Sequence, residues 1–302
     1  MVVVGGFVPL IREKHPVRAQ TLRSWPLIAR FFHLESQLGG VAKQRPVLAG
    51  TFEFVRFGFK QAWACLFGGV MVVLIAGTHL AYPAGAALPR YDFLVLASIA
   101  VQVALLTLRM ETLEEAKVIL LFHAVGTAME IFKTAVGSWT YPEPSYLRLG
   151  GVPLFTGFMY AAVGSYIVRS WRLFDYRFER HPSTGAMIAL ACAIYANFFT
   201  NHWGLDLRWL LFVWALAIFG RGVIHFRVWR VHRKMPMLVA CGLTAIFIWI
   251  AENVGTYSRV WLYPHQTQAW SPVGFGKFSS WFLLLIISYV MVATVNRPRP
   301  PD

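Results

Sequence analysis

Eight apolar segments dominate this sequence of 302 residues. Each is close to the roughly 20 residues that an α-helix needs to cross a bilayer core about 30 Å thick. They are, approximately, 61–82, 91–108, 116–136, 152–168, 186–203, 207–226, 236–257 and 278–295. Hydrophobic residues make up 57% of the chain and charged residues only 14%, whereas soluble domains carry about 25% charge. The sequence therefore predicts an all-α, polytopic transmembrane bundle of about eight helices.

The basic residues predict the orientation of this bundle. Of the 28 Lys and Arg residues, only five lie in the four loops on one side, and most of the others lie in the terminal segments and loops on the opposite side. Because cytoplasmic loops carry the excess of Lys and Arg, we expect both termini in the cytoplasm. The same bias accounts for most of the formal net charge of +14, so we exclude a nucleic-acid partner.

The domain organisation that we expect follows from the same pattern. Residues 1–50 precede the first apolar segment and resemble a partly flexible cytoplasmic extension, with Arg12, Lys14 and Arg18 after an apolar start. A signal peptide has its positive charges first, so we expect no cleavage. Residues 51–302 form the transmembrane domain of a multi-pass protein of a bacterial cytoplasmic (inner) membrane, with the lipid bilayer as its partner.

An internal duplication is the most specific feature of the sequence. Residues 130–142 align without a gap to residues 252–264, and Glu, Thr, Trp, Tyr and Pro recur at identical places in both copies. We expect two copies of a four-helix unit, about 61–171 and 184–295. An even number of helices in each unit gives both copies the same orientation, which is a parallel repeat with its axis along the membrane normal.

The repeated glutamates, Glu130 and Glu252, are the candidate catalytic residues. Each lies nine residues before a tryptophan that suits the headgroup level, so a continuous helix places it up to about 13 Å deeper in the membrane. Ionisable residues at such depth usually face a bundle interior and serve a function. Acid/base chemistry or proton transfer would suit these carboxyls. Alternatively, Lys133, on the same helical face as Glu130, simply neutralises it.

Further residues near these acids are candidate ligand contacts. They are His79, His123, Trp139, Tyr141, His202, Asn253, Thr256, Trp261 and Tyr263. The aromatic residues of this set equally suit a membrane-interface belt, and each histidine equally suits a packing role. The three histidines and two glutamates would converge on one cavity that opens outward.

The sequence specifies no cofactor. The three cysteines, Cys65, Cys192 and Cys241, stand singly in apolar segments, without the spacing of a metal knuckle or a redox pair. No two histidines have the i, i+4 spacing of a helical zinc site. We therefore predict no metal site.

Four segments carry a resemblance to a known family. Residues 130–142, 151–166, 196–202 and 248–256 closely resemble a bacterial integral-membrane family catalogued as domain of unknown function 817. The resemblance runs from about Phe54 to the C-terminus. It implies membership of that family and carries no activity with it.

A weaker, local resemblance bears on mechanism. Glu252, Gly255 and Thr256, followed by Trp261 and Tyr263, look like the helix ends of membrane carotenoid cyclases and hydratases, although the first copy has Lys133 where the second has Gly255. This likeness implies acid/base chemistry on an apolar, isoprenoid-like ligand. A proton-coupled small-molecule transporter and a binding protein without turnover remain the alternatives, and the sequence leaves the oligomeric state open.

Overall fold

The computed structural model describes residues 46–301, and these are mostly helical. They form nine α-helices, one short 3-10 helix and five short strands. The α-helices are α3 (Pro46–Ala64), α4 (Leu66–Ala81), α5 (Arg90–Thr107), α6 (Leu113–Ala135), α7 (Phe155–Leu173), α8 (Thr184–Thr200), α9 (Arg208–Phe219), α10 (Met237–Tyr257) and α11 (Lys277–Val295). The remaining elements are β1 (Arg148–Leu149), β2 (Val152–Pro153), β3 (Arg177–Glu179), β4 (Val223–Arg227), β5 (His232–Pro236) and the 3-10 helix η1 (Pro264–Gln266).

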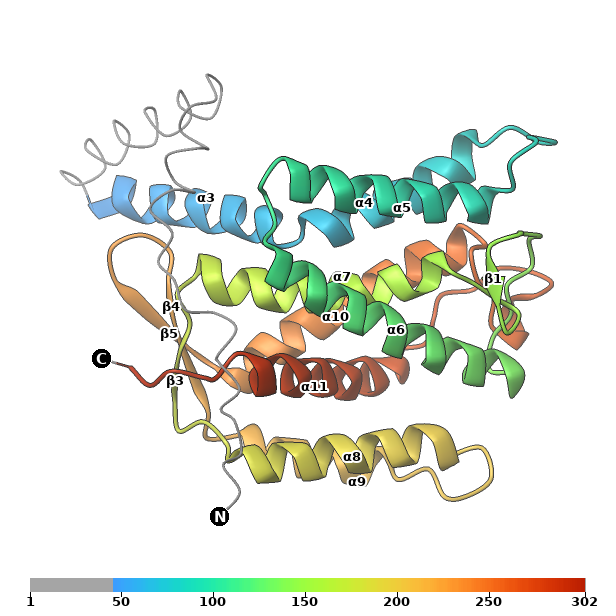
Figure 1. The fold of residues 1–302 in the computed structure, drawn as a ribbon. Coiled ribbons are helices and arrows are strands. Elements are labelled where there is room, and N and C mark those ends of the chain that lie inside the picture. Colours follow the sequence, from blue (N-terminus) through green and yellow to red (C-terminus); the bar gives the residue numbers. More distant parts are fainter. Residues whose placement is uncertain (1–45, 302) are drawn as a thin grey trace, which may run out of the picture.

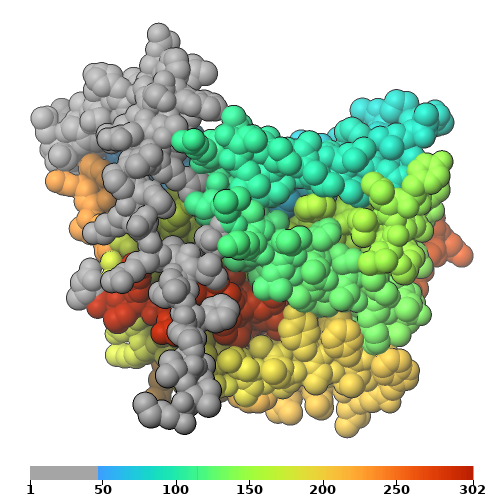
Figure 2. All heavy atoms as spheres, viewed as in Figure 1, coloured from blue at the N-terminus to red at the C-terminus, as the bar shows by residue number. Residues whose placement is uncertain are grey.

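The helices run side by side and give the molecule two distinct ends (Figure 1). At one end, here called the sheet end, strands β3, β4 and β5 form an antiparallel sheet in that order. At the other, here called the motif end, lie the loops that follow α6 and α10 and the small β1–β2 hairpin. In the space-filling view, the segment containing α8 forms one edge of the molecule and the segment containing α5 forms the opposite edge (Figure 2).

Within residues 46–301, four helices are long and apolar enough to cross a membrane: α5, α6, α10 and α11. A fifth span results if α3 and α4, which meet at an angle of 69° around Cys65, are counted together. The chain just before the first predicted span is therefore also helical: α3 leads into α4 with a bend. Of the predicted extension, residues 1–45 lie outside the residues that the structure describes.

Exposed apolar stripes support a membrane environment for these helices. In α10, Val239, Leu243, Phe247 and Ile250 are all exposed, and Phe247 is 70% exposed. Their spacing of three or four residues places them on one face of the helix. Water would penalise such a continuous apolar surface, whereas lipid tails would not.

The predicted segment 207–226 is interrupted, which corrects the expectation of a long helix there. The helix α9 ends at Phe219, and β4 begins at Val223 as part of the three-stranded sheet. Gly220 and Gly222 lie at the break, and alternating residues that favour strands follow them. Twelve residues span only about 18 Å, so α9 alone is shorter than a bilayer core.

The two small sheets also correct the expectation of an all-α chain. Both lie at helix ends, and both connect helices through antiparallel pairs. Backbone N–H and C=O groups that leave a helix still need partners, and short ladders supply them. The helical framework itself agrees with the sequence, since every predicted apolar segment overlaps one of the described helices.

Small residues allow α6 and α7 to pack at close range. A Cβ atom built on Gly157 in α7 would lie 2.4 Å from Thr127 Oγ1 and 2.5 Å from His123 Nδ1. One built on Gly126 in α6 would lie 2.6 Å from the side chain of Tyr160. Glycine at these positions brings the two backbones together, which is a common way for membrane helices to associate.

The exposed face of α10 provides a test of the membrane environment. We expect Leu243→Arg to place a charge among lipid tails at a cost of about 2.5–3.5 kcal/mol, and to reduce the amount of protein in the membrane fraction. Quantitative immunoblotting of membrane and soluble fractions measures this effect. Leu243→Phe is the control and should behave like the wild type; equal membrane levels for the arginine variant would place this face away from lipid.

Candidate active site

Glu130 and Glu252 lie at equivalent places near the ends of α6 and α10. A capping box between Thr112 and Glu115 starts α6, which then runs to Ala135. After each helix the chain turns back in the same way: Gly137 has a φ of 72° and Arg259 has a φ of 54°. Such left-handed residues typically terminate helices.

The hydrogen bonds of these two turns are also equivalent. The N–H of Ser138 donates to the carbonyl of Lys133 at 2.9 Å, and the N–H of Val260 donates to the carbonyl of Gly255 at 3.1 Å. These six-to-one bonds belong to the Schellman motif, which satisfies the last carbonyls of a helix. The turn reverses the chain, so the residues after each helix return toward the glutamate inside it.

Three aromatic side chains hold Glu130, which is only 3% exposed. Tyr141 Oη donates to Glu130 Oε2 at 2.5 Å, and Trp139 Nε1 donates to the same oxygen at 2.7 Å. Tyr160 Oη, from α7, donates to Glu130 Oε1 at 2.8 Å. All three hydrogen-bond donors to this carboxyl are thus neutral groups on aromatic rings.

Glu252, 2% exposed, is held in a closely related way. Tyr263 Oη donates to Glu252 Oε1, and Trp281 Nε1, from α11, donates to Glu252 Oε2. Tyr263 occupies the position equivalent to Tyr141, so both glutamates accept a hydrogen bond from the tyrosine eleven residues later. A buried carboxyl needs such hydrogen bonds, because they replace the bonds to water that it loses on burial.

The two loops meet directly at the motif end. Thr140 and Leu262, which are equivalent residues of the two copies, exchange both backbone hydrogen bonds at 2.9 Å as an antiparallel bridge. The ring of Trp139 contacts the ring of Tyr263 edge-on, with centroids 6.0 Å apart. Glu252 is also among the charges that act on Glu130. The structure therefore brings the two acids into one polar centre, here called the glutamate pair.

The start of α5 fixes both loops. Tyr91 Oη donates to the carbonyl of Val260 at 2.7 Å. Arg90 donates to the carbonyl of Ser258 at 2.9 Å. Arg90 also forms an ion pair with Glu143 at 2.9 Å. Asp92 accepts from the N–H groups of Tyr146 and Leu147, both at 2.8 Å. These bonds join one end of α5 to the loop of each copy, which stabilises the glutamate pair from outside.

The tyrosines of the loops stay protonated donors. Burial, followed by the charge of Glu130, raises the pKa of Tyr141 well above its ordinary value. Burial also raises the pKa of Tyr263, and the charges of Glu252 and Glu130 add to the effect. That Glu130 acts on Tyr263, a residue of the other copy, again reflects the close approach of the two loops.

The copies differ where Lys133 replaces Gly255. A Cβ atom on Gly255 would lie 2.0 Å from the ring of Trp261, so that tryptophan packs directly against the glycine. Lys133 occupies the equivalent position in α6, and Trp139 donates to Glu130 instead. Among the described residues, the tryptophan that donates to Glu252 is Trp281 and not Trp261.

Sequence reasoning missed two donors, Tyr160 and Trp281. Each lies on the helix that follows its motif. The only signal for them in the sequence is an aromatic residue with an N–H or O–H group that could donate to a buried acid. The sequence alone does not show which face of α7 or α11 meets the glutamates.

Four other predicted contacts, His79, His123, Asn253 and Thr256, are not among the described hydrogen-bond partners of the two carboxyls. His79 contacts the ring of Tyr257 at 5.7 Å between centroids, and His123 packs against Phe158 at 4.4 Å. Asn253 Oδ1 accepts from the N–H of Val273 at 2.9 Å, which fixes the loop before α11. Thr256 Oγ1 accepts from Trp270 Nε1 at 3.2 Å. These partners are loop and packing residues, so any ligand contact by the four residues stays a prediction.

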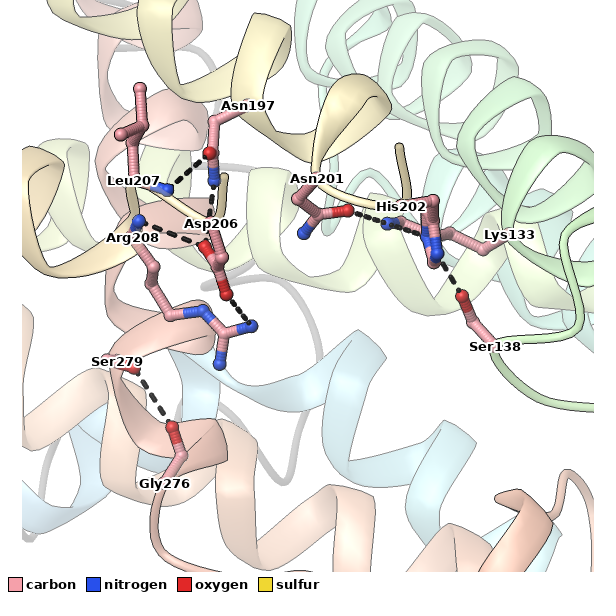
Figure 3. A network of polar contacts seen from close by, with 10 residues as sticks. All are labelled: Lys133, Ser138, Asn197, Asn201, His202, Asp206, Leu207, Arg208, Gly276 and Ser279. Atoms are coloured by element: carbon pink, nitrogen blue, oxygen red, sulfur yellow. Dashed lines mark hydrogen bonds and ion pairs between the residues drawn. The ribbon is translucent and has the colours of Figure 1, made fainter. Parts of the chain in front are cut away.

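His202 lies in a separate network with Lys133 at the end of α6 (Figure 3). Lys133 Nζ donates to His202 Nε2 at 2.8 Å and to Asn201 Oδ1 at 3.3 Å. Ser138 Oγ lies 3.3 Å from the same histidine nitrogen. Lys133 therefore turns away from Glu130, and within the described part of the chain the two form no ion pair. This arrangement contradicts the interpretation that Lys133 simply neutralises Glu130.

Residues 46–301 contain no group of three or more His, Cys, Asp or Glu side chains that could hold a metal ion. An open groove of about 700 Å³ lies at the sheet end, lined by residues that include His181, Arg297 and Arg299. None of the predicted contact residues lines this groove.

Chemically, the glutamate pair is suited to exchange a proton. Each carboxyl accepts hydrogen bonds from two or three neutral donors, which stabilise the negative charge left after a proton departs. The faces of the surrounding Trp and Tyr rings are negative and attract cations. A carboxyl beside such rings can hold or release a proton next to an apolar ligand.

The packing of Trp261 on Gly255 gives a test of the motif. We expect Gly255→Ala to displace the tryptophan and lower stability by about 1–3 kcal/mol, the usual range for overpacking. Thermal unfolding followed by tryptophan fluorescence measures the change. Gly242→Ala, in the same helix but with no atom within 4 Å of an added Cβ, is the matched control and should be neutral or stabilising. A similar effect of both variants would mean that Trp261 does not pack on Gly255.

Comparisons with known proteins identify the family of this chain. Residues 53–289 match the family model described as "Protein of unknown function (DUF817)". The chain is 42% identical over 247 residues to the protein named "Uncharacterized protein YoaT" of Bacillus subtilis (strain 168), covering 82% of this chain and 93% of that protein. No solved structure matches. Because the family model covers well over half of the sequence, the chain belongs to the DUF817 family.

Proposed function

We propose that this DUF817 protein is a multi-pass protein of the bacterial inner membrane, built as a parallel 4 + 4 repeat of about 61–171 and 184–295. The equivalent Schellman turns at Gly137 and Arg259 support the duplication. So does the bridge between Thr140 and Leu262, because only equivalent residues pair in this way across a local twofold axis. In this proposal α8 and α9 complete the membrane bundle despite their shorter length.

The sheet end faces the cytoplasm in this proposal. Its strands and their connections carry many basic residues, among them Arg177, Arg180, Arg227, Arg230 and Arg233. The C-terminal segment lies at the same end (Figure 1). Basic residues next to membrane helices favour the cytoplasmic side, so the glutamate pair belongs near the outer leaflet.

Membrane-impermeant maleimide labelling tests this orientation. In a variant that lacks Cys65, Cys192 and Cys241, a cysteine at Gly204, in the α8–α9 loop, should react in intact spheroplasts. A cysteine at Arg299, at the sheet end, should react only after the membrane is opened. The reverse pattern would invert the topology and place the glutamate pair on the cytoplasmic side.

We further propose that Glu130 and Glu252 perform acid/base chemistry on an apolar, isoprenoid-like ligand within the bilayer. The observation that carries this proposal is the pairing of two buried carboxyls, each held only by neutral aromatic donors. One protonated carboxyl gives its proton to a carbon–carbon double bond, which leaves a carboxylate and a carbocation. Tyr and Trp hydrogen bonds stabilise the carboxylate, and aromatic faces stabilise the cation.

The carbocation then loses a proton from a neighbouring carbon, or takes up water and releases a proton, and a carboxylate of the pair accepts that proton. Protons therefore balance over one turnover, and no redox partner is needed. Trp139, Tyr141, Trp261 and Tyr263 are the proposed aromatic contacts, while His79, His123, His202, Asn253 and Thr256 are proposed to border the ligand.

A second candidate is a proton-coupled transporter of a small molecule. The observation that favours it is the position of the acids, which lie where the two copies meet through Thr140 and Leu262. Parallel repeats in transporters often place the substrate site at the interface between copies. Glu130 and Glu252 would then carry protons as the copies rock against each other.

Carboxyl-to-amide variants test the acid/base proposal and separate it from transport. We expect lipid extracts of cells that express the wild type to contain a hydrated or isomerised apolar species, detected by mass spectrometry. Glu130→Gln and Glu252→Gln should reduce it by about 10²–10⁴-fold, the usual contribution of a general acid or base. Glu179→Gln, at the sheet end, is the matched control and should retain it.

Proteoliposomes provide the other arm of this experiment. If lipid extracts are unchanged but wild-type vesicles take up protons with a solute, and the glutamine variants do not, transport replaces chemistry. Wild-type behaviour of both glutamine variants in both assays would remove the carboxyls from either mechanism.

A further inference from the structure

Lys133 is a buried cation whose partners are all neutral. Its side chain is 5% exposed, and its ammonium donates to Asn201 and His202. It also lies 4.2 Å from the centroid of the Phe198 ring and 5.7 Å from that of Phe132. Among the residues that the structure describes, no carboxylate lies within ion-pair distance of it. Burying an ammonium costs several kcal/mol unless an opposite charge compensates it.

Two more cations lie around Lys133. Lys277 and Arg208 are the neighbouring positive charges that act on it. Asp206, the acid whose charge acts on Lys133, is already paired with Arg208 at 2.9 Å. Lys277 lies over the ring of Tyr263, 4.5 Å from its centroid, and the charge of Glu252 acts on it. The charge of Lys277 therefore reaches Lys133, and among the described residues neither ammonium forms an ion pair with a carboxylate.

Polar groups complete this cluster toward the surface. His202 is exposed, and its Nε2 accepts from Lys133, so its other ring nitrogen carries a proton and can donate. Burial, together with Lys133 and Lys277, lowers the pKa of His202, so the ring is neutral near pH 7. Figure 3 shows the ends of α6 and α8 bringing Ser138, Asn201 and His202 around the Lys133 ammonium. A ligand can approach this side from outside the bundle.

We propose that Lys133, Lys277, His202 and Ser138 bind an oxyanion, a carboxylate or phosphate group, at the motif end. Ammonium groups and a hydroxyl are suitable donors for such oxygens, and the bound charge would compensate Lys133. Lys133 lies one helical turn from Glu130, and Lys277 contacts the tyrosine that holds Glu252.

The oxyanion site is therefore next to the glutamate pair, and this step rests on the proposed function. The ligand has an anionic head at Lys133 and an apolar body that reaches the carboxyls. A free anion from solution and the headgroup of a lipid share this chemistry, and the probes below distinguish them.

The test measures thermal unfolding of the full-length protein in phosphatidylcholine nanodiscs. Sodium phosphate, sodium octanoate and phosphatidylglycerol are the three probes, and sodium chloride holds the ionic strength constant because salt screens surface charges. At about ten times its dissociation constant, a binding probe should raise the midpoint by on the order of 3 °C. A shift with phosphate or octanoate indicates a solution anion, and a shift with phosphatidylglycerol alone indicates a lipid headgroup.

Lys133→Met is the decisive variant. It should lose the shift, and without a probe it should be at least as stable as the wild type, because an uncompensated buried charge is gone. Lys234→Met, an exposed lysine of the sheet end, is the matched control and should keep the full shift. Should Lys133→Met fail to fold, Lys277→Met provides the second measurement, and its affinity for the active probe should fall about tenfold or more.

Three results would overturn the oxyanion site: no shift with any probe, an undiminished shift in Lys133→Met, or an equal loss in Lys234→Met. Failure of the acid/base proposal is separate from these. Glu252→Gln should keep the probe-induced shift of the unfolding midpoint. If the protein binds the anion normally but neither glutamate takes part in chemistry, only the proposed function is rejected.

Discussion

The structure depends on one requirement, which is that two carboxyls buried in an apolar bundle must have hydrogen-bond partners. Tyr141 and Tyr263 meet this requirement, and each can do so only because the chain reverses at Gly137 or Arg259. The same reversal places Thr140 against Leu262 and joins the two halves of the chain. The same chain reversals therefore provide the hydrogen-bond donors to the acids and bring the two copies into contact.

The differences between the copies are as informative as their likeness. Where α10 has Gly255, Trp261 packs against the glycine; where α6 has Lys133, the equivalent Trp139 donates to the glutamate. In the second copy of the motif, Trp281 from the following helix supplies the missing donor. One exchange of a small residue for a charged one therefore gives the first copy a polar network that the second lacks, with Lys133, Asn201 and His202 at its centre.

The exposed apolar surface and the site follow opposite rules. On α10, exposed residues such as Leu243 and Phe247 are apolar, whereas buried Glu252 is ionisable. A soluble protein usually reverses this distribution, because water solvates charges and lipid does not. Not every part of the chain forms a long helix: α9 is short, and strands form a sheet at one end of the molecule. In these strands, backbone groups outside the helices find hydrogen-bond partners.

The sequence by itself determined the helical framework, the repeat motif and the identity of the two acids, because hydrophobic periodicity and residue spacing are local properties. It named Tyr141 and Tyr263 as candidate ligand contacts, but it did not show that they return to the acids as hydrogen-bond donors. The sequence did not reveal the donors Tyr160 and Trp281, the break after Phe219 or the partners of Lys133. Those depend on which helix faces meet, and packing between residues far apart in the sequence decides that. Only the tertiary structure could show that Lys133 turns toward His202 rather than Glu130, because both choices satisfy the same helical spacing.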